Sequence, residues 1–283
     1  MSEWPLVVFT LAIQLSCGLA LAATVADWAG NRSDTAMRPL GIAIFPVAAI
    51  GLLASLLHLG RPLTAWKSLY NLGSSRLSLE VLLTLLFVLA ALIYSHSWWA
   101  HRPDHRVLTG IATSLLAVAA VASSTAIYLV PTQPAWNAGW VPISFFGTAL
   151  LLGGSASAAF GNLHVPRNLL GCFLGGAVAG SLMLASSAVW MFATLSRVPL
   201  DDFAAARLRE ALHLLTAQHP IALGLHLLLT TVIPIAFAAL LWFGWSLPGA
   251  SPLLRLLAFL AITLGAFIGR GLMVLVGTLP RQF

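Results

Sequence analysis

Long apolar stretches alternate with short polar connections along the whole chain. Each stretch is close to the ~20 residues that an α-helix needs to cross the hydrocarbon core of a membrane. The transmembrane strands of β-barrels are shorter and alternate in polarity, so this pattern excludes them. We therefore predict an all-α polytopic membrane protein: a single domain, residues 1–283, folded as a bundle of eight transmembrane helices. The predicted spans are residues 5–26, 39–59, 78–98, 107–130, 141–160, 168–193, 221–245 and 253–277.

An even number of spans places both ends of the chain on one side of the membrane, called side A here. Side A also holds the connections at 60–77, 131–140 and 194–220, and the opposite side B holds those at 27–38, 99–106, 161–167 and 246–252. Because the longer connections lie on side A, we expect a partner protein to dock there. The cationic residues divide almost equally between the two sides, so the positive-inside rule leaves the orientation open.

The connection at 200–218 is predicted to form an interfacial amphipathic helix. Asp201 and Asp202 suit its first turn, where the helix dipole favours negative charge. Its apolar side chains lie close to one face: Phe203, Leu208, Leu212 and Leu215. Such a helix can lie along the membrane surface.

Small residues within the spans predict close packing between helices. The sixth span carries Gly175, Gly176 and Gly180. In lipid, small residues let helix backbones approach each other, so these glycines favour a compact bundle.

The composition supports the membrane assignment. Hydrophobic residues make up 59% of the chain and charged residues only 8%, whereas soluble domains carry about 25% charged residues. The net charge of +6 reflects a scarcity of acids, and the cations occur singly, which argues against nucleic-acid binding. The two cysteines, Cys17 and Cys172, are too few for an iron–sulfur cluster. We expect a multi-pass protein of a bacterial inner membrane.

Four ionisable residues fall at membrane depth: His58, Glu80, His226 and Arg270. Each costs about 2.5–3.5 kcal/mol on insertion scales, so each is a candidate for a functional role. The predicted topology places all four near side A. This shared depth predicts one polar pocket just below the side A surface.

Each of these residues also has a structural alternative. His58 can end a helix at the interface, and Glu80 follows Ser78, a possible N-cap, so that its carboxylate would lie in the first turn. His226 can form an interhelical hydrogen bond, and Arg270 can pair with a helix C-terminus or a lipid head group. A single haem between His58 and His226 is a further alternative.

Tryptophans near the ends of the spans are typical of the aromatic belt at a membrane interface. They are Trp4, Trp66, Trp98, Trp99, Trp136 and Trp140.

Several short segments carry a resemblance to a known family. The most specific is Ala54-Ser-Leu-Leu-His-Leu-Gly-Arg-Pro62, followed at the family's distances by Ser68-Leu-Tyr-Asn-Leu-Gly73 and Leu77-Ser-Leu-Glu80. The others are Glu3-Trp-Pro-Leu6 with Phe9-Thr10, Val130-Pro-Thr-Gln-Pro-Ala-Trp136, Pro142 with Phe145-Phe146, Gly153-Gly154 and Ile268-Gly-Arg270. Together they resemble the membrane-anchor subunit of bacterial dimethyl sulfoxide reductase, one of the eight-span quinol-interacting anchors of molybdoenzymes.

The resemblance implies a complex of three subunits. A molybdenum-cofactor catalytic subunit reduces an S-oxide or N-oxide, and an iron–sulfur electron-transfer subunit carries electrons to it. The anchor oxidises menaquinol in anaerobic respiration and itself contains no haem and no iron–sulfur cluster. The protein is then not an enzyme on its own.

The resemblance also implies roles for individual residues. His58 matches the histidine that contacts the quinol, Glu80 matches the acid that opens the third span, and Arg270 matches the Gly-Arg of the last span. The sequence departs from the family in one place, because the acid expected before Ile-Gly-Arg is replaced by an apolar residue at Ala266 or Phe267.

These residues suggest a mechanism. An imidazole can accept a quinol proton near neutral pH, so we expect His58 to be the acceptor and Glu80 to relay the proton to side A. Three residues of the connection between them, Trp66, Tyr70 and Asn71, complete the pocket or seat the partner.

Two alternatives remain at this point. One is an anchor of a related complex that serves polysulfide, tetrathionate or nitrite chemistry. The other is a secondary transporter, which would have discontinuous helices and inverted repeats. Pro46 and Pro234 interrupt spans, but the two halves of the sequence show no repeat.

Overall fold

The protein is a bundle of long helices, seen in a computed structural model that describes residues 3–29, 34–58, 62–161, 165–196, 203–243 and 251–277. The long helices are α1 (Trp4–Trp28), α2 (Asp34–His58), α3 (Arg76–Trp99), α4 (Arg106–Tyr128), α5 (Trp140–Phe160), α6 (Arg167–Ser196) and α10 (Pro252–Gly277). Another span is built from α8 (Pro220–Leu227), the π-helical segment η4 (Leu228–Val232) and α9 (Ile233–Phe243). Within the described residues there is no strand.

Shorter helical segments lie between the spans. Two are 3₁₀-helices, η1 (Pro62–Asn71) and η2 (Pro103–His105). The connection after α6 contains α7 (Phe203–His213), which continues into the π-helical segment η3 (Leu214–Gln218).

The eight predicted spans are confirmed. Eight helical segments of the described residues are long and apolar enough to cross a membrane. Their ends differ from the predicted ends by a few residues, most clearly in α2, which begins at Asp34 rather than at residue 39. The prediction of an all-α polytopic membrane protein therefore holds.

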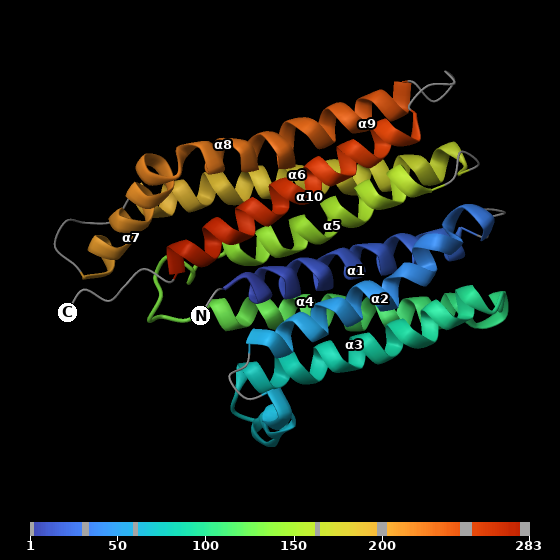
Figure 1. Ribbon diagram of the computed structural model, residues 1–283, viewed down its shortest axis with the longest axis horizontal. Coiled ribbons are helices and arrows are strands. Elements are labelled where there is room, and N and C mark those ends of the chain that lie inside the picture. Colours follow the sequence, from blue (N-terminus) through green and yellow to red (C-terminus); the bar gives the residue numbers. More distant parts are fainter. Residues whose placement is uncertain are drawn as a thin grey trace.

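The helices form two groups that meet at α1 (Figure 1). In the first group α1 packs against α2 and α4, and α3 packs against both of these helices. In the second group α5 packs against α6 and α10, α9 packs against α6, and α8 packs against α10. Helix α1 joins the groups because it also contacts α5 and α10. It begins at the same end of the bundle at which α10 ends, and this end is side A (Figure 1).

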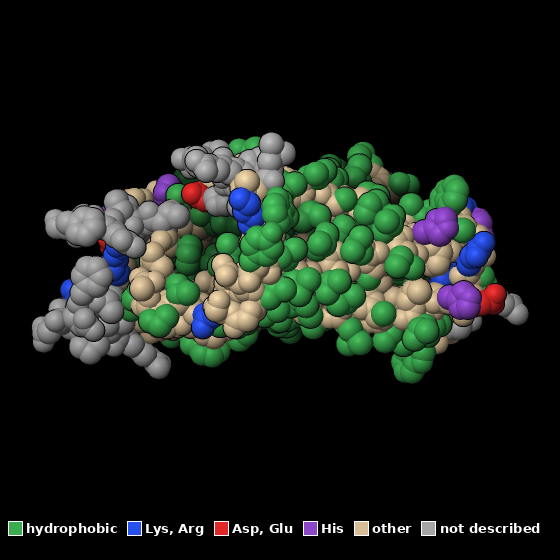
Figure 2. Space-filling model, turned by 90° about the horizontal axis from the view of Figure 1, so that it is seen from below, with side chains coloured by type: hydrophobic (Ala, Val, Ile, Leu, Met, Phe, Trp, Pro, Cys, Tyr) green, Lys and Arg blue, Asp and Glu red, His purple; other side chains and the backbone are tan. Residues whose placement is uncertain are grey.

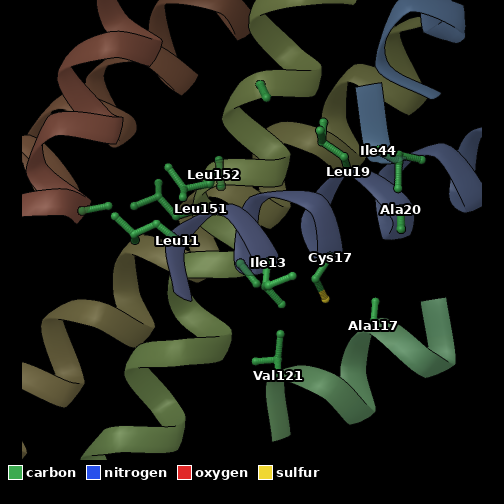
Figure 3. Packing of buried hydrophobic residues seen from close by; sticks show 14 of the residues in the cluster. Leu11, Ile13, Cys17, Leu19, Ala20, Ile44, Ala117, Val121, Leu151 and Leu152 are labelled. Carbon is green, nitrogen blue, oxygen red and sulfur yellow. The ribbon is translucent and has the colours of Figure 1, made fainter. Parts of the chain in front are cut away.

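The centre of the core lies around α1. Figure 3 shows side chains of α1, among them Leu11, Ile13 and Cys17, between residues of three other helices. These neighbours are Ile44 of α2, Ala117 and Val121 of α4, and Leu151 and Leu152 of α5. Helix α1 is therefore covered on several sides by protein rather than by lipid.

Helices α1 and α5 approach each other closely at two glycines. A Cβ atom at Gly18 would overlap the carbonyl oxygen of Ala149, and one at Gly153 would overlap the backbone of Gly18. Gly180 of α6 makes a similar approach to the backbone of α5 at Leu151. Gly175 and Gly176, however, have open space around them, so of the three predicted packing glycines Gly180 is the one that brings two helices together.

Hydroxyl side chains link neighbouring helices in the first group. Ser16 of α1 donates to the carbonyl oxygen of Ile44 on α2 at 2.7 Å. Ser95 of α3 donates to the carbonyl oxygen of Gly41 on α2 at 2.9 Å. Hydrogen bonds of this kind contribute to helix association in lipid, where apolar burial alone gives little preference for one partner.

The outer surface has the distribution expected of a membrane protein. In the view of Figure 2, hydrophobic side chains cover the middle of the molecule, and lysine, arginine, histidine and acidic side chains gather toward its two ends. Large apolar side chains of the spans are exposed, including Leu108 of α4, Ile93 of α3 and Leu257 of α10. A lipid bilayer matches this apolar band and its polar ends.

The apolar face of α7 and η3 is buried against the bundle. Leu208, Ala211 and Leu215 pack in a small apolar cluster with Leu195 of α6 and Leu272 of α10. Residues 200–202 of the predicted interfacial helix lie outside the described residues. A location of this helix along the membrane surface stays a prediction.

The contact between α1 and α5 generates a first prediction. We expect Gly153→Ala to lower the thermal unfolding midpoint, because the added methyl group must push the α1 backbone away at a cost of about 1–3 kcal/mol. The matched control is Gly175→Ala, which adds the same methyl group in open space and gains helix propensity of about 1 kcal/mol. Equal midpoints for both variants in detergent would contradict the assigned packing.

Candidate functional site

Glu80 lies in the second turn of α3, close to the side A end of the bundle. Only 8% of the residue is exposed. The predicted N-cap, Ser78, is wrong: the Ser75 side chain accepts a hydrogen bond from the Ser78 backbone N–H, and α3 begins at Arg76. Glu80 thus lies beyond the first turn, so an interaction with the helix end does not explain its burial.

The side chain of Glu80 faces helix α4. Arg76 donates to the carbonyl oxygen of Ala126 at 2.9 Å and also to that of Leu129. These bonds tie the start of α3 to the end of α4, where the Ser124 side chain interacts with the Glu80 carboxyl group. The carboxyl group therefore points into a small polar region between two helices.

Tyr128 extends this polar region toward the second group of helices. It is buried, and the charged groups near enough to influence its hydroxyl group are Arg270, Glu80 and Glu3. Its ring packs against Trp136 at 5.0 Å and Phe145 at 5.4 Å between centroids. Tyr128 was not predicted from the sequence. The available signal was a tyrosine at the side A end of an apolar span, a position that is also common in interfacial belts.

Arg270 lies fully inside the bundle, with 4% of the residue exposed. One guanidinium nitrogen, Nη2, donates to Oε1 of Gln14 on α1 at 3.0 Å, and Nη1 lies 3.1 Å from the sulfur of Met273. The guanidinium also stacks on the Phe145 ring at 3.7 Å. The expected partners, a helix C-terminus or a lipid head group, are replaced by Gln14. Within the described residues, no carboxylate forms an ion pair with Arg270.

His226 forms the interhelical hydrogen bond that was one of its two predicted roles. Its Nδ1 lies 2.8 Å from the carbonyl oxygen of Gly265 on α10. Because a carbonyl oxygen only accepts, Nδ1 is the donor in this hydrogen bond. The next helical turn is widened into η4, and Pro234 lacks the N–H that a regular helix would donate to Thr230.

A cavity of about 60 Å³, called the Arg270 cavity here, lies between α5, α6, α8, η3 and α10. Its polar lining consists of Trp140, Ser144, Thr148, Ser187, His226 and Arg270. Glu80 does not line it. His226 and Arg270 therefore share a cavity that Glu80 does not line, and because the side chain of His58 lies outside the described residues, one pocket for all four membrane-depth residues stays a prediction.

His58 is the last residue of α2, and its side chain lies outside the described part of the structure. The next described segment is η1, which packs against α3 and α2. Within η1, Trp66 and Tyr70 are 54% and 71% exposed and touch edge to face at 5.3 Å. Asn71 is exposed as well. The contact predicted between His58 and Glu80 stays a prediction.

Three of the predicted belt tryptophans are not at the lipid interface. Trp98 and Trp140 are almost completely buried within the bundle. Trp136 is half-buried, and its indole N–H donates to the carbonyl oxygen of Met273 on α10 at 2.8 Å. Trp4, Trp66 and Trp99 are exposed, as a belt requires.

A buried ion pair at side B was not predicted from the sequence. Asp27 of α1 lies 3.3 Å from Nε of Arg106 on α4, and both side chains are largely buried. Tyr94 of α3 donates to Asp27 at 2.7 Å, and the Arg106 guanidinium lies over the Trp98 ring at 4.1 Å. This cluster fastens three helices at the end of the bundle opposite to Glu80.

The described residues contain no group of three histidine, cysteine or acidic side chains that would hold a metal ion. Cys17 is buried in α1 and Cys172 is exposed on α6, both as free thiols. The absence of haem and of an iron–sulfur cluster from this protein stays a prediction, because the His58 side chain belongs to the part not described.

Comparisons with known proteins agree with the resemblance found in the sequence. The family model for the DMSO reductase anchor subunit (DmsC) matches residues 1–276. The C subunit of anaerobic dimethyl sulfoxide reductase from Escherichia coli (strain K12) is 26% identical over 95% of the present sequence and 93% of its own length.

Two further relatives match over a shorter range. The anaerobic dimethyl sulfoxide reductase subunit YnfH of E. coli is 30% identical over 56% of the present sequence and 57% of its own length. The C subunit of anaerobic dimethyl sulfoxide reductase from Haemophilus influenzae is also 30% identical, over 56% of the present sequence and 58% of its own length.

The ion pair at side B allows a direct test. Asp27→Ala leaves a buried guanidinium without its partner, and we expect a loss of about 3–5 kcal/mol in the free energy of unfolding. The double variant Asp27→Ala with Arg106→Met removes both charges and should recover much of this loss. If the single and double variants are equally destabilised in denaturation experiments, the ion pair is not what holds this end together.

Proposed function

The protein belongs to the DMSO reductase anchor subunit family, and on this premise we propose that it binds menaquinol in the membrane, oxidises it and passes the electrons to an iron–sulfur partner subunit. The terminal reduction belongs to a molybdenum-cofactor subunit of the same complex. The anchor itself contributes the quinol site and the membrane attachment.

The observation that carries this proposal is the buried carboxyl group of Glu80. A carboxyl group at membrane depth is costly and is retained where it serves a function. Glu80 has a hydrogen bond with Ser124, is close enough to Tyr128 to influence its hydroxyl group, and lies near the end of the bundle where α2 ends at His58. A quinol ring that enters from the bilayer between α2 and α3 would meet both residues.

The reaction requires acceptors for two protons and two electrons, because oxidation of a quinol breaks two O–H bonds and leaves the quinone. We assign the role of proton acceptor to the His58 imidazole, which hydrogen-bonds one ring hydroxyl. Glu80 takes each proton in turn from His58 and releases it to water at side A, so that His58 can accept the second proton as well. The two electrons leave one at a time to the oxidised clusters of the partner.

Arg270 has a less direct role in this scheme. Arg270 and Glu80 both lie close enough to Tyr128 to influence its hydroxyl group electrostatically. The positive charge of Arg270 favours the development of negative charge on Tyr128 or on a nearby ring oxygen. We therefore place Arg270 at the far edge of the quinol site and assign it an electrostatic influence without contact with the quinol ring.

The exposed aromatic pair of η1 is suited to a protein partner. Trp66 and Tyr70 belong to the segment between α2 and α3, at the side A end (Figure 1). Lys67 lies 5.9 Å from the Trp66 ring centre. Aromatic residues are enriched in the central parts of protein interfaces. A partner bound there would bring its nearest cluster close to the quinol site.

The test of the quinol site compares two electron sources in the assembled complex. We expect His58→Leu and Glu80→Gln to lower quinol-driven turnover by about 100-fold or more, since proton transfer by a positioned group contributes about 10²–10⁴-fold. Turnover driven by a reduced viologen dye, which delivers electrons to the partner subunits directly, should not change.

His105→Leu is the matched control, because His105 is exposed near side B. It should leave both activities unchanged. Normal quinol-driven turnover in the His58 and Glu80 variants would contradict the proposed site.

The docking surface can be tested by co-purification. We expect Trp66→Ala with Tyr70→Ala to reduce the amount of iron–sulfur subunit that co-purifies with the anchor by about 10-fold or more, as the loss of a dominant interface aromatic costs about 2 kcal/mol or more. The control, Trp99→Ala, removes a similarly exposed tryptophan at side B. Equal recovery of the partner with both variants would place the docking surface elsewhere.

A further inference from the structure

The side B end of the second group of helices carries positive charge that no acid of the same helices balances. The sequence has no aspartate or glutamate in residues 105–200 or 211–283, which include α5, α6, α8, α9 and α10. Two arginines lie at the side B end of these helices. Arg167 is the first residue of α6, and Arg255 lies in the first turn of α10. The negative charge that would balance them has to come from outside this group.

Helix α9 fixes the position of Arg167. The guanidinium carbon of Arg167 lies 4.8 Å from the centre of the Trp242 ring, near the end of α9. A Cβ atom at Gly171, one turn further along α6, would lie 3.1 Å from the same ring. The indole therefore packs along the beginning of α6 and holds the guanidinium by a cation–π contact. Because side chains tilt towards the N-terminus of their helix, Arg167 points to the side B end.

Arg255 lies on the face of α10 that is turned towards α5. Phe259 lies one turn later on this face, and its ring packs edge to face on Phe160, the last residue of α5, at 5.1 Å between centroids. Arg255 is one turn nearer to the side B end, and its side chain also tilts in that direction. The end of α5 and the beginning of α10 thus meet just below Arg255.

The beginnings of α6 and α10 border one surface. Helices α5 and α9 each contact both α6 and α10. The end of α9 and the beginning of α10 lie at the same end of the bundle, opposite to the two chain termini (Figure 1). Arg167 and Arg255 therefore lie around the same end of four neighbouring helices, and we call this the Arg167–Arg255 surface.

The guanidinium of Arg255 offers hydrogen-bond donors to a guest. Among the described residues it has no hydrogen bond and no ion pair, and of its nitrogens only Nε is enclosed by the protein without a partner. The arginines of the first group at this side differ, because Arg38 donates to the carbonyl oxygen of Trp99 at 3.0 Å and Arg106 has Asp27 at 3.3 Å. Paired guanidinium N–H groups match the oxygens of a phosphate group.

The surroundings of Arg255 are apolar and exposed, which indicates what kind of phosphate compound is bound. Leu253, Leu254, Leu256 and Leu257 are all exposed beside it, and Leu253 is 62% exposed. These side chains belong to a membrane-spanning helix, so they lie against acyl chains of the bilayer. A phospholipid satisfies both requirements at once, since its phosphate group lies at the level of the arginines and its chains run along the leucines.

From these observations we propose that the Arg167–Arg255 surface binds one anionic phospholipid, with its phosphate group held by Arg255 and Arg167 and its acyl chains along the exposed leucines of α10. The lipid supplies the negative charge that the second group of helices lacks and fastens α6, α9 and α10 together. The site lies at the end of the bundle opposite to the proposed quinol site and does not depend on quinol oxidation by the protein.

Native mass spectrometry of the assembled complex in detergent, titrated with phosphatidylglycerol or phosphatidylcholine, tests the proposal. We expect the first phosphatidylglycerol to bind more tightly than the first phosphatidylcholine. Arg255→Gln and Arg167→Gln should each weaken phosphatidylglycerol binding by about 5-fold, which is what the loss of one cation near a membrane surface corresponds to. Binding of phosphatidylcholine should not change, because this lipid has no net charge.

The matched control is Arg102→Gln. Arg102 is exposed at side B between α3 and α4, so this variant removes the same charge from the same side of the membrane but away from the surface in question. It should keep the full affinity for phosphatidylglycerol. An equal loss of affinity in all three variants would indicate a general effect of charge at side B and would overturn the proposal.

The position of the lipid is tested by electron cryo-microscopy of the complex in nanodiscs that contain phosphatidylglycerol. We expect a headgroup whose phosphate oxygens lie within hydrogen-bonding distance of Nη1 or Nη2 of Arg255, beside Arg167. A surface without an ordered headgroup, or one covered by an acidic segment of a partner subunit, would contradict the proposal, as would equal affinities for the two lipids. None of these results bears on quinol-driven turnover, so this proposal and the proposed function fail independently.

Discussion

Helices α1 and α5 lie so close together at Gly18 and Gly153 that neither position has room for a Cβ atom. This contact joins the two groups of helices. Gln14 lies one helical turn before Gly18 and therefore on the same face of α1, which brings its amide to Arg270 on α10. Larger side chains at the two glycines would separate the groups and withdraw the polar partner of Arg270. The position of the most deeply buried charge thus depends on two residues that have no side chain.

Because the interior of a bilayer contains no water, each buried ionisable group needs polar or charged partners within the protein. Asp27 and Arg106 neutralise each other and, with Tyr94, hold α1, α3 and α4 together at side B. Glu80 has a hydrogen bond with the side chain of Ser124. The guanidinium of Arg270 contacts the amide of Gln14, the thioether of Met273 and the ring of Phe145. The ion pair holds the helices together, whereas Glu80 has no ion-pair partner among the described residues and is the group beside which we place the quinol.

The spans could be predicted from the sequence because length and apolar composition suffice to define them. For the polar residues of the interior, only their depth in the membrane could be predicted. Glu80 and Arg270 were expected near side A, but which residues they would face depends on helix rotation, which apolar periodicity does not determine in a chain that is hydrophobic on all sides. Gln14, Tyr128 and the burial of Trp140 were missed because each residue type also occurs in lipid-facing or interfacial positions.

The ion pair at side B shows a different limit. The predicted spans ended at residue 26 and began at residue 107, so Asp27 and Arg106 were each placed just outside. In the structure α1 continues to Trp28 and α4 begins at Arg106, because two opposite charges that neutralise each other can be drawn into the helical bundle. Likewise, Ser75 rather than Ser78 caps α3, and the next residue, Arg76, donates a hydrogen bond to α4.

The central claim is that the side A end of α2 and α3 receives the quinol ring and faces the iron–sulfur subunit. The most direct measurement is an experimental structure of the assembled complex with a non-oxidisable menaquinol analogue. We expect the ring between His58 and Glu80, with the nearest cluster of the partner on the η1 side of the membrane. A ring bound near Asp27 and Arg106 at side B, or a partner docked at that end, would contradict it.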